Sequence, residues 1–370
     1  MSLVDLSDIA EMLAAQAESL CSEILPSGRR HGNEWVEAST KKGGLGDGLK
    51  VCLSGSRRGI WKHFGDAGSG GDMLELVAYV LFSGDKKKAV AWAKNRLGLE
   101  KADPDAIRAQ RQKARAFARR RELAAQEEEE SRRKFAKSIW HNASPNLSGS
   151  PADSYYYHRG IILVDLPKMP GALRFAPRLK HPDGRHYAGI VAQINGPDGQ
   201  FMAVHRTFLS QDGHVWRKAS LGQQSKMVLG PYAGGFISLN RGISSKPFGA
   251  APEGDKLIIC EGIEDGLSLA LACPEFRVIA AISVSNFKNL CLPATMSHVV
   301  IAADNDPEFL IRDGEKIKHP ARCSLEQAVG RFVSEGRDVF VARSPAGKDF
   351  NDCLRDGGSH SDLAVERVLA

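Results

Sequence analysis

The sequence lacks the marks of a secreted, disulfide-rich or membrane protein. None of its seven cysteines forms a CxxC pair, and an odd, scattered set of this kind is typical of reduced thiols in the cytosol. A structural zinc site is not expected, because zinc requires four closely spaced Cys or His ligands. No apolar run approaches the length of a membrane span, and the first residues, MSLVDLSDIAEMLAAQ, carry acids where a secretory signal carries bases. A cytoplasmic protein without membrane contact is therefore expected.

Two further absences limit the function classes. The Walker A pattern GxxxxGK[ST] does not occur, so a helicase that works with this chain must be a separate protein. The charge is not strongly one-sided, because 50 Lys and Arg stand against 44 Asp and Glu, for a net charge of +6. This balance is compatible with an anionic partner, and with DNA as that partner it predicts salt-sensitive binding.

Changes of composition predict an α/β multidomain protein. Residues 1–100 combine amphipathic helices with glycine-punctuated strands, as in a small α+β module. Residues 101–143 are rich in Lys, Arg and Glu, which is typical of a solvated, charged helix acting as a linker. Residues 144–252 alternate polar and apolar side chains between Gly-containing turns, which indicates a β-rich domain. Residues 253–370 alternate short apolar strands with helices, which predicts a parallel, doubly wound sheet.

Acidic residues stand at the predicted carboxyl ends of these parallel strands. Glu261 follows the strand LIIC, and Asp304 and Asp306 follow HVVIAA. Asp349 and Asp352, in GKDFND, lie just after the fourth strand. One acid in such a place is commonly a helix N-cap, but several carboxylates that converge on one sheet edge cannot all ionise without a counterion. Oxygen ligands of this kind suit Mg²⁺ or Mn²⁺, so the sequence predicts a metal site that engages phosphates.

The three acidic motifs, CEGIEDGLS, AADNDP and PAGKDFND, resemble those of toprim domains, which bacterial primases, topoisomerases and some nucleases share. The resemblance is closer to the toprim primases of phages, plasmids and integrated mobile elements. It covers the last third of the chain and extends more loosely upstream, through HRTFLSQDGHVWRKAS and KMVLGPYAGGFISL. It implies a primase that makes short RNA primers on single-stranded DNA from nucleoside triphosphates.

The resemblance also implies roles for individual residues. Glu261 corresponds to the catalytic acid that binds metal or relays a proton, and Asp304 and Asp306 to the acids whose metal engages the incoming nucleotide. Glu264 and Asp265 fall on the first turn of the following helix, where acids favour the helix dipole, and are not expected to be ligands. The implied metal ligands are Glu261, Asp304, Asp306, Asp349 and Asp352.

Basic residues upstream of the acidic motifs fit a nucleotide or template role, because phosphate-rich substrates need fixed cations. A strand that presents Arg and Lys beside Trp216 also suits a single-stranded template, whose bases stack on aromatic rings. Taken singly, each of these cations is equally a solvated surface charge. The expected nucleotide- or template-binding residues are Arg206, Arg217, Lys218 and Lys226.

The N-terminal segments GIWKHFGDAG and GSGGDMLELVAYV resemble the end of the zinc-ribbon module with which replicative primases of this superfamily begin. The zinc ligands are not in place, since Trp61, His63 and Phe64 stand where a Cys pair is expected. A set of Cys21, His31, Cys52 and His63 is poorly spaced. The module is either a zinc-free descendant that contacts the template or an ordinary small domain. The basic residues available for such contact are Arg29, Arg30, Lys41, Lys42, Arg57 and Arg58.

Two alternatives to a primase remain open at this stage. A toprim nuclease would use the same acids to cleave DNA without added nucleotides. A catalytically silent nucleic-acid-binding module of a mobile element is the other, although the presence of all three acidic clusters argues against a silent site. A topoisomerase is not expected, because no Tyr is placed as in a strand-passing domain.

Overall fold

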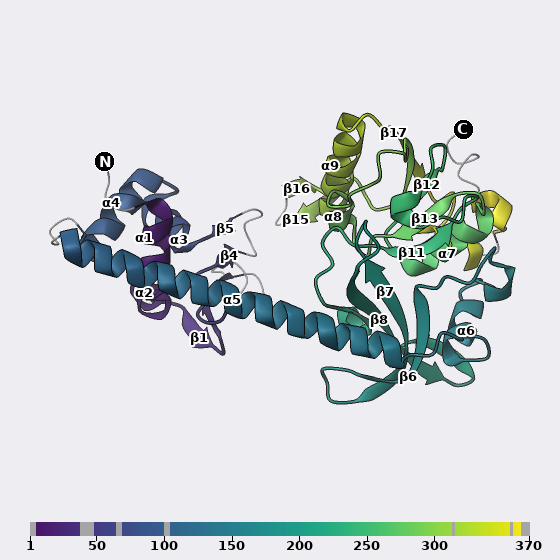
Figure 1. Ribbon diagram of the computed structural model, residues 1–370, viewed down its shortest axis with the longest axis horizontal. Coiled ribbons are helices and arrows are strands. Elements are labelled where there is room, and N and C mark those ends of the chain that lie inside the picture. The colour runs from purple at the N-terminus through teal and green to yellow at the C-terminus, as the bar shows by residue number, and fades with distance from the viewer. Residues whose placement is uncertain are drawn as a thin grey trace. The chain divides into compact units, whose positions relative to one another are not determined.

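The computed structural model of this chain describes residues 5–37, 48–63, 69–99, 104–312, 315–355 and 358–363. These form two compact units, Met1–Glu130 and Ser131–Ala370 (Figure 1). Helices and several sheets occur together, which confirms the predicted α/β multidomain class. Among the described helices, none is both long and apolar enough to cross a membrane.

The first unit packs helices against a small antiparallel sheet. Its helices are α1 (Leu6–Ala14), α2 (Ala17–Ile24), α3 (Met73–Phe82) and α4 (Lys86–Arg96). The strands follow one another in the order β1 (Arg29–His31), β2 (Glu34–Glu37), β3 (Leu49–Cys52), β4 (Trp61–His63) and β5 (Gly70–Gly71). Asp72 begins α3, because its carboxylate accepts hydrogen bonds from the amides of Leu74 and Glu75. The core of this unit joins the apolar faces of α1, α2 and α3 to buried Val51 and Trp61.

A single long helix, α5 (Pro104–Asn142), occupies most of the predicted charged segment. Its basic residues are not all solvated. Within the first unit, Arg115 Nε donates to Asp8 Oδ1 on α1 at 2.9 Å, and Arg111 also pairs with Asp8. Arg121 pairs with Glu11 at 3.2 Å. In this unit the basic face of α5 therefore fixes α1 through ion pairs.

The β-rich part of the second unit is an antiparallel sheet. Its strands are β6 (Leu173–Lys180), β7 (His186–Asn195), β8 (Phe201–Asp212), β9 (Val215–Lys218) and β10 (Lys226–Leu229), with helix α6 (Pro151–Tyr157) beside them. The order is β10-β8-β7-β6, and β9 pairs with the end of β8. Successive residues of β8 point to opposite faces, so His205 and Arg206 lie on different sides of the sheet. One side joins the core of the C-terminal sheet, and the other packs on the end of α5 through Ala136 and Trp140.

The C-terminal sheet has the order β11-β13-β12-β14-β17. Its strands are β11 (Ile237–Arg241), β12 (Leu257–Cys260), β13 (Arg277–Ala280), β14 (His298–Ala303) and β17 (Asp338–Arg343). All pairs are parallel except the antiparallel pair of β11 and β13. The edge strand β11 precedes the predicted domain boundary at residue 253, so this sheet begins earlier in the chain than the composition indicates.

Helices cover both faces of this sheet (Figure 1). One face carries α7 (Ile263–Ala272) and α10 (Phe350–Arg355), and the other carries α8 (Val284–Phe287) and α9 (Pro320–Ser334). A small hairpin, β15 (Phe309–Arg312) and β16 (Glu315–Lys318), precedes α9. Because β12, β13 and most of β14 are buried on both faces, they read as continuous apolar runs. Gly266 lets α7 approach β12 closely, since a Cβ there would lie 2.3 Å from Leu239 Cδ1 and 2.9 Å from Cys260 Sγ.

The ion pairs of Asp8 yield a stability prediction. Asp8 is 4% exposed, and although burial disfavours its charge, hydrogen bonds and charges from Arg115 and Arg111 hold the pKa below its usual value. Asp8→Ala removes the buried partner that Arg111 and Arg115 share and leaves them only the exposed carboxylate of Asp5, so it is expected to destabilise the protein by about 2 kcal/mol in urea unfolding. The contribution of the Asp8 ion pairs is lost as pH falls through the lowered pKa. The difference in the free energy of unfolding between variant and wild type should therefore narrow in acid.

Asp5→Ala is the matched control, because Asp5 pairs with the same Arg111 at 2.8 Å but is largely exposed. An exposed pair contributes less than about 1 kcal/mol. Equal destabilisation by the two substitutions would contradict the assignment of Asp8 as the anchor of α1.

Candidate active site

Carboxylates from three strand ends meet at the carboxyl edge of the parallel sheet. Glu261, Asp304 and Asp349 line one cavity of about 230 Å³, and Asp306 lines an adjoining hollow with Glu261 and Asp304. The ammonium of Lys348 lies among them, 3.7 Å from Asp304 Oδ2 and 3.9 Å from Asp306 Oδ1. The structure thus brings together four of the acids that the sequence singles out and adds a lysine that it did not.

The acidic loops are fixed by main-chain contacts. Asn305, the middle residue of Asp-Asn-Asp, donates through Nδ2 to the carbonyls of Ser344 and Gly347, at 2.9 and 3.0 Å. Arg343 donates to the carbonyl of Asp304 at 2.6 Å, and Arg322 donates to that of Asp306 at 2.8 Å. These contacts use no carboxylate oxygen, so within the described residues the two Asp side chains pair only with Lys348 and keep their other oxygens for a ligand.

The carboxylates raise one another's pKa values. Burial, with the neighbouring charges of Asp304 and Asp306, raises the pKa of Glu261 to about 7, against the opposing effect of Lys348. Burial also raises the pKa of Asp304, and Lys348 opposes that shift. For Lys348 itself, burial disfavours the charge, but Asp304 and Asp306 outweigh it and raise the pKa. One ammonium therefore compensates the cluster only in part.

The donor set fits a divalent cation. In the described part of the chain, no three His, Cys, Asp or Glu side chains already surround one point closely enough to hold an ion, and Lys348 provides the counter-charge. All the donors are carboxylate oxygens, the ligands that Mg²⁺ and Mn²⁺ prefer. Burial and the charges of Asp304 and Asp306 raise the pKa of Glu261, and a cation bound here would oppose both effects.

The two acids of GKDFND have different surroundings. Asp349 lines the cavity, and its Oδ1 accepts from the amide of Asp352 at 2.7 Å, which begins α10. Asp352 is turned toward Arg355, whose Nη1 donates to Oδ1 at 3.1 Å. The geometry thus favours Asp349 over Asp352 as a ligand.

A buried ion cluster adjoins the acids in the same cavity. Glu264, 5% exposed, accepts from Tyr155 Oη at 2.6 Å and pairs with Lys218 at 3.0 Å and Lys226 at 3.1 Å. Burial opposes its ionisation, but Lys226 and Lys218 hold the pKa of Glu264 well below its usual range. Glu264 does lie on the first turn of α7, as expected, yet its main contacts are these lysines and not the helix end.

Asp265, its neighbour, accepts from the amide of Asn351 at 3.0 Å and so ties α7 to α10. Glu264 holds Lys218 and Lys226, from the β-rich sheet, beside the acids of the parallel sheet.

Sequence reasoning missed further residues of this cavity. His205 lines it, and burial together with Lys226 lowers the pKa of the imidazole to about 3, so the ring is neutral at physiological pH. Arg159 lines it as well, and its carbonyl accepts from Asn351 Nδ2. Ile282 holds a positive φ of 76° while its amide donates to the carbonyl of Glu261, which indicates local strain beside the site. Arg159 and Ile282 lie outside the quoted motifs, and His205 begins the upstream segment HRTFLSQDGHVWRKAS without an acidic motif beside it, so only their contacts identify these three residues.

Three residues predicted to contact the template do not line the cavity of the acids. Arg206 faces the opposite side of the β-rich sheet from His205 and lines a different groove. Arg217 is exposed and lies 3.6 Å from the carboxylate of Asp212. Trp216 packs against the core shared with the C-terminal sheet and is not an open stacking platform. The structure thus brings Lys218 and Lys226 to the acids, and leaves Arg206 and Arg217 away from them.

The predicted basic residues of the first unit have varied surroundings. Arg29 and Arg30 are exposed on β1, and Arg30 pairs with Glu18 at 3.1 Å. Arg57 is exposed, and Arg58 donates to the carbonyl of Ala15 at 2.7 Å. Lys41, Lys42 and Phe64 lie outside the described residues.

Of the candidate zinc ligands, Cys21 is buried on α2, and burial raises the pKa of its thiol to about 12. A thiol of this kind stays protonated at neutral pH and is a poor metal ligand.

Comparison with known proteins agrees with the C-terminal assignment. Residues 256–360 match the family model of the toprim domain, which confirms the predicted toprim domain. Residues 130–239 match a domain of unknown function, DUF7146. A search of curated proteins finds no match.

Solved structures similar to the chain include three primases. The zinc-binding and RNA polymerase domains of the Aquifex aeolicus primase are 16% identical with a TM-score of 0.36, over 98% of this chain and 84% of that one. A primase domain from Pseudomonas aeruginosa is 16% identical with a TM-score of 0.37, over 64% and 78%. The primase fragment of the bacteriophage T7 primase-helicase protein is 18% identical with a TM-score of 0.34, over 53% and 66%.

The raised pKa of Glu261 predicts a pH-dependent stability without metal. Between the ordinary value of 4.5 and about 7, the folded state holds a proton that the unfolded state releases, so stability falls as pH rises through this range. Glu261→Gln removes that proton exchange. In EDTA, the Tm of the variant should exceed that of wild type most above pH 7, and the difference should vanish near pH 4.5. A difference in Tm that is constant across this range would show that Glu261 is not the strained acid of the cluster.

Proposed function

We propose that this chain, whose residues 256–360 form a toprim domain, is a DNA primase that synthesises short RNA primers on a single-stranded DNA template. One observation carries the proposal: the cavity that holds Glu261, Asp304 and Asp349 also holds Lys218 and Lys226. Joining nucleotides requires both kinds of group, carboxylates for metal and cations for the phosphates. The resemblance of the three acidic motifs to those of phage, plasmid and mobile-element primases supports the same reaction.

The expected metal ligands are Asp304, Asp306 and Asp349, with Glu261 beside them. A Mg²⁺ or Mn²⁺ ion bound there would neutralise triphosphate charge and activate the attacking hydroxyl. Asp352, held by Arg355, would take part only after a change of side-chain conformation.

The side chains can then divide the remaining work. The 3′-oxygen of one nucleotide forms a bond to the α-phosphorus of the next, and the bond to pyrophosphate breaks. Glu261, with a pKa of about 7, suits the role of accepting the proton that the hydroxyl loses. Lys218 and Lys226, oriented by Glu264, offer their ammonium groups to the phosphates of the incoming nucleotide.

The proposal extends to partners and setting. The template is single-stranded DNA, the substrates are nucleoside triphosphates, and a replicative helicase is the expected partner. The setting is the replication of a mobile element in the cytoplasm.

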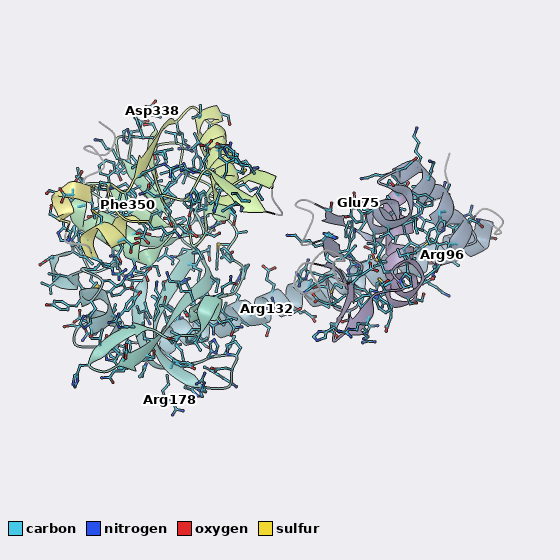
Figure 2. All side chains as sticks on the ribbon, turned by 180° about the vertical axis from the view of Figure 1, so that it is seen from behind. Glu75, Arg96, Arg132, Arg178, Asp338 and Phe350 are labelled. Atoms are coloured by element: carbon cyan, nitrogen blue, oxygen red, sulfur yellow. The ribbon has the colours of Figure 1, made fainter. Side chains whose placement is uncertain are left out.

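The direct test is primer synthesis on mixed-sequence single-stranded DNA with labelled nucleotides and Mg²⁺ or Mn²⁺. Wild type should yield short products. The Asp304→Asn, Asp306→Asn double variant should be slower by at least about 100-fold, because it lacks the two carboxylate charges that would stabilise the transition state. Asp338→Asn is the matched control, since this exposed carboxylate begins β17 and so lies at the amino end of a strand, whereas the site acids follow carboxyl ends. Figure 2 shows Asp338 at the surface of its unit. Cleavage of the template by wild type without added nucleotides would instead identify a nuclease.

The lysines predict a separate effect on nucleotide binding. Lys226→Gln keeps a hydrogen-bond donor for Glu264 but removes a charge from the cavity. We expect KM for the nucleoside triphosphate to rise by about tenfold, with a smaller change in kcat, because the ammonium contacts phosphate in ground and transition states alike. Lys256→Gln is the control, because Lys256 precedes β12 at the amino end of the strand and Glu261 follows its carboxyl end. This variant should change neither KM nor kcat. A change in kcat alone would rule out a phosphate-binding role for Lys226.

A further inference from the structure

The face of the β-rich sheet that is turned away from the acids carries a groove of about 600 Å³. Its walls are apolar: Phe135 and Ile139 from the end of α5, and Ala176 and Leu179 from β6. The ring of Phe135 is 56% exposed, which is unusual for a large aromatic side chain. A groove of this size and lining is within the range of small-ligand sites.

A guanidinium lies at the floor of this groove. Arg206 is 7% exposed and lies in the middle of the sheet, where its neighbours across the strands are Val191 and Met227. Its Nε is buried and has no hydrogen-bond partner within the described residues. The ring of Phe208, 5.6 Å from the guanidinium carbon, gives a cation–π contact.

No carboxylate compensates this charge in the described part of the chain. The groove lining includes neither Asp nor Glu. Asp183, two residues after the groove residue His181, already pairs with Arg185, Tyr187 and His181. Burial lowers the pKa of Arg206, with no acidic neighbour to oppose it. Because a buried charge without a partner is strongly unfavourable, the arrangement is explained best by an anion that binds from outside.

The rim of the groove indicates which anion. Arg178 and Lys180 project from the edge strand β6, and His186 lies beside them; Figure 2 shows Arg178 extending outward from the unit. Cations along a rim suit successive phosphates, while an exposed aromatic ring and an aliphatic wall suit a base. A carboxylate on a peptide would use the buried guanidinium but not this extended basic rim.

We propose that this groove binds a nucleotide unit, with its phosphate on Arg206 and its base against Phe135 and Ile139. The site is distinct from the cavity of Glu261 and does not depend on the proposed primase activity. The phosphate belongs either to a DNA strand or to a free nucleotide, since both present the same group to Arg206.

Arg206→Met tests the site through two readouts that a structural arginine would move together. The substitution removes an uncompensated charge and keeps an unbranched apolar stem, so the Tm of the free protein should rise by about 3 °C. The same variant should bind labelled oligo(dT), in EDTA, about tenfold more weakly than wild type. When log Kd is plotted against the logarithm of the salt concentration, the slope for the variant should be smaller than that for wild type by about 1.

Two further variants make the result specific. Phe135→Ala, at an exposed position, should weaken oligo(dT) binding without lowering Tm, and Arg241→Gln, an exposed arginine at the end of β11, should leave Kd within about twofold. Thymidine 5′-monophosphate as a second probe distinguishes the sources: loss of binding for both probes indicates a free-nucleotide site, and loss for oligo(dT) alone indicates a strand.

The Asp304→Asn, Asp306→Asn double variant should retain this binding, so failure of the proposed catalysis and failure of this site are separable. Wild-type affinity of Arg206→Met and Phe135→Ala for both probes would overturn the proposal. So would a lower Tm of Arg206→Met, because it would show that the guanidinium already has a partner inside the protein.

Discussion

Mutual repulsion among the carboxylates at one edge of the parallel sheet is the constraint on which the site depends. Parallel strands end at the same edge, so Glu261, Asp304 and Asp349 are brought together by topology. Burial, together with carboxylate charges that Lys348 offsets only in part, raises the pKa of Glu261 and Asp304. Hydrogen bonds to the main chain keep the acidic loops in place despite this repulsion. They come from Asn305, Arg322 and Arg343 and use no carboxylate oxygen. Under the proposed function, a site built in this way would bind a divalent cation and, with it, phosphates.

The two faces of the β-rich sheet carry buried charges in different electrostatic surroundings. On one face, Lys218 and Lys226 share the buried charge of Glu264 and stand beside the acids. On the other, Arg206 is buried without a carboxylate partner in the described residues. The single step from His205 to Arg206 along β8 separates these environments. The sheet therefore carries a charge-compensated cluster beside the acids on one face and, on the other, the uncompensated charge for which we propose an outside ligand.

The sequence was sufficient for the parallel sheet and its acids, because strand burial and chain order are local signals. Buried strands such as LIIC and HVVIAA are continuous apolar runs, and the residue after each lies at the ligand-binding edge whatever the rest of the chain does. The pairing of Glu264 with Lys218 and Lys226 could not be read in the same way, since it joins two different sheets. The position of Arg206 on the face turned away from the acids could not be predicted for a related reason. Residues 203–209 of β8 are buried on both faces, so no polar alternation reveals which face His205 or Arg206 occupies.

Calorimetric titration of Mn²⁺ into the metal-free protein, in two buffers of different ionisation enthalpy, tests the central claim most directly. If the clustered carboxylates await a cation, wild type and Asp338→Asn will bind Mn²⁺ and, below the pKa of Glu261, release a proton as they do so. The Asp304→Asn, Asp306→Asn variant will bind far more weakly. Equal binding by wild type and the double variant, or no binding by either, would contradict the account, because the raised pKa values would then not mark a metal site.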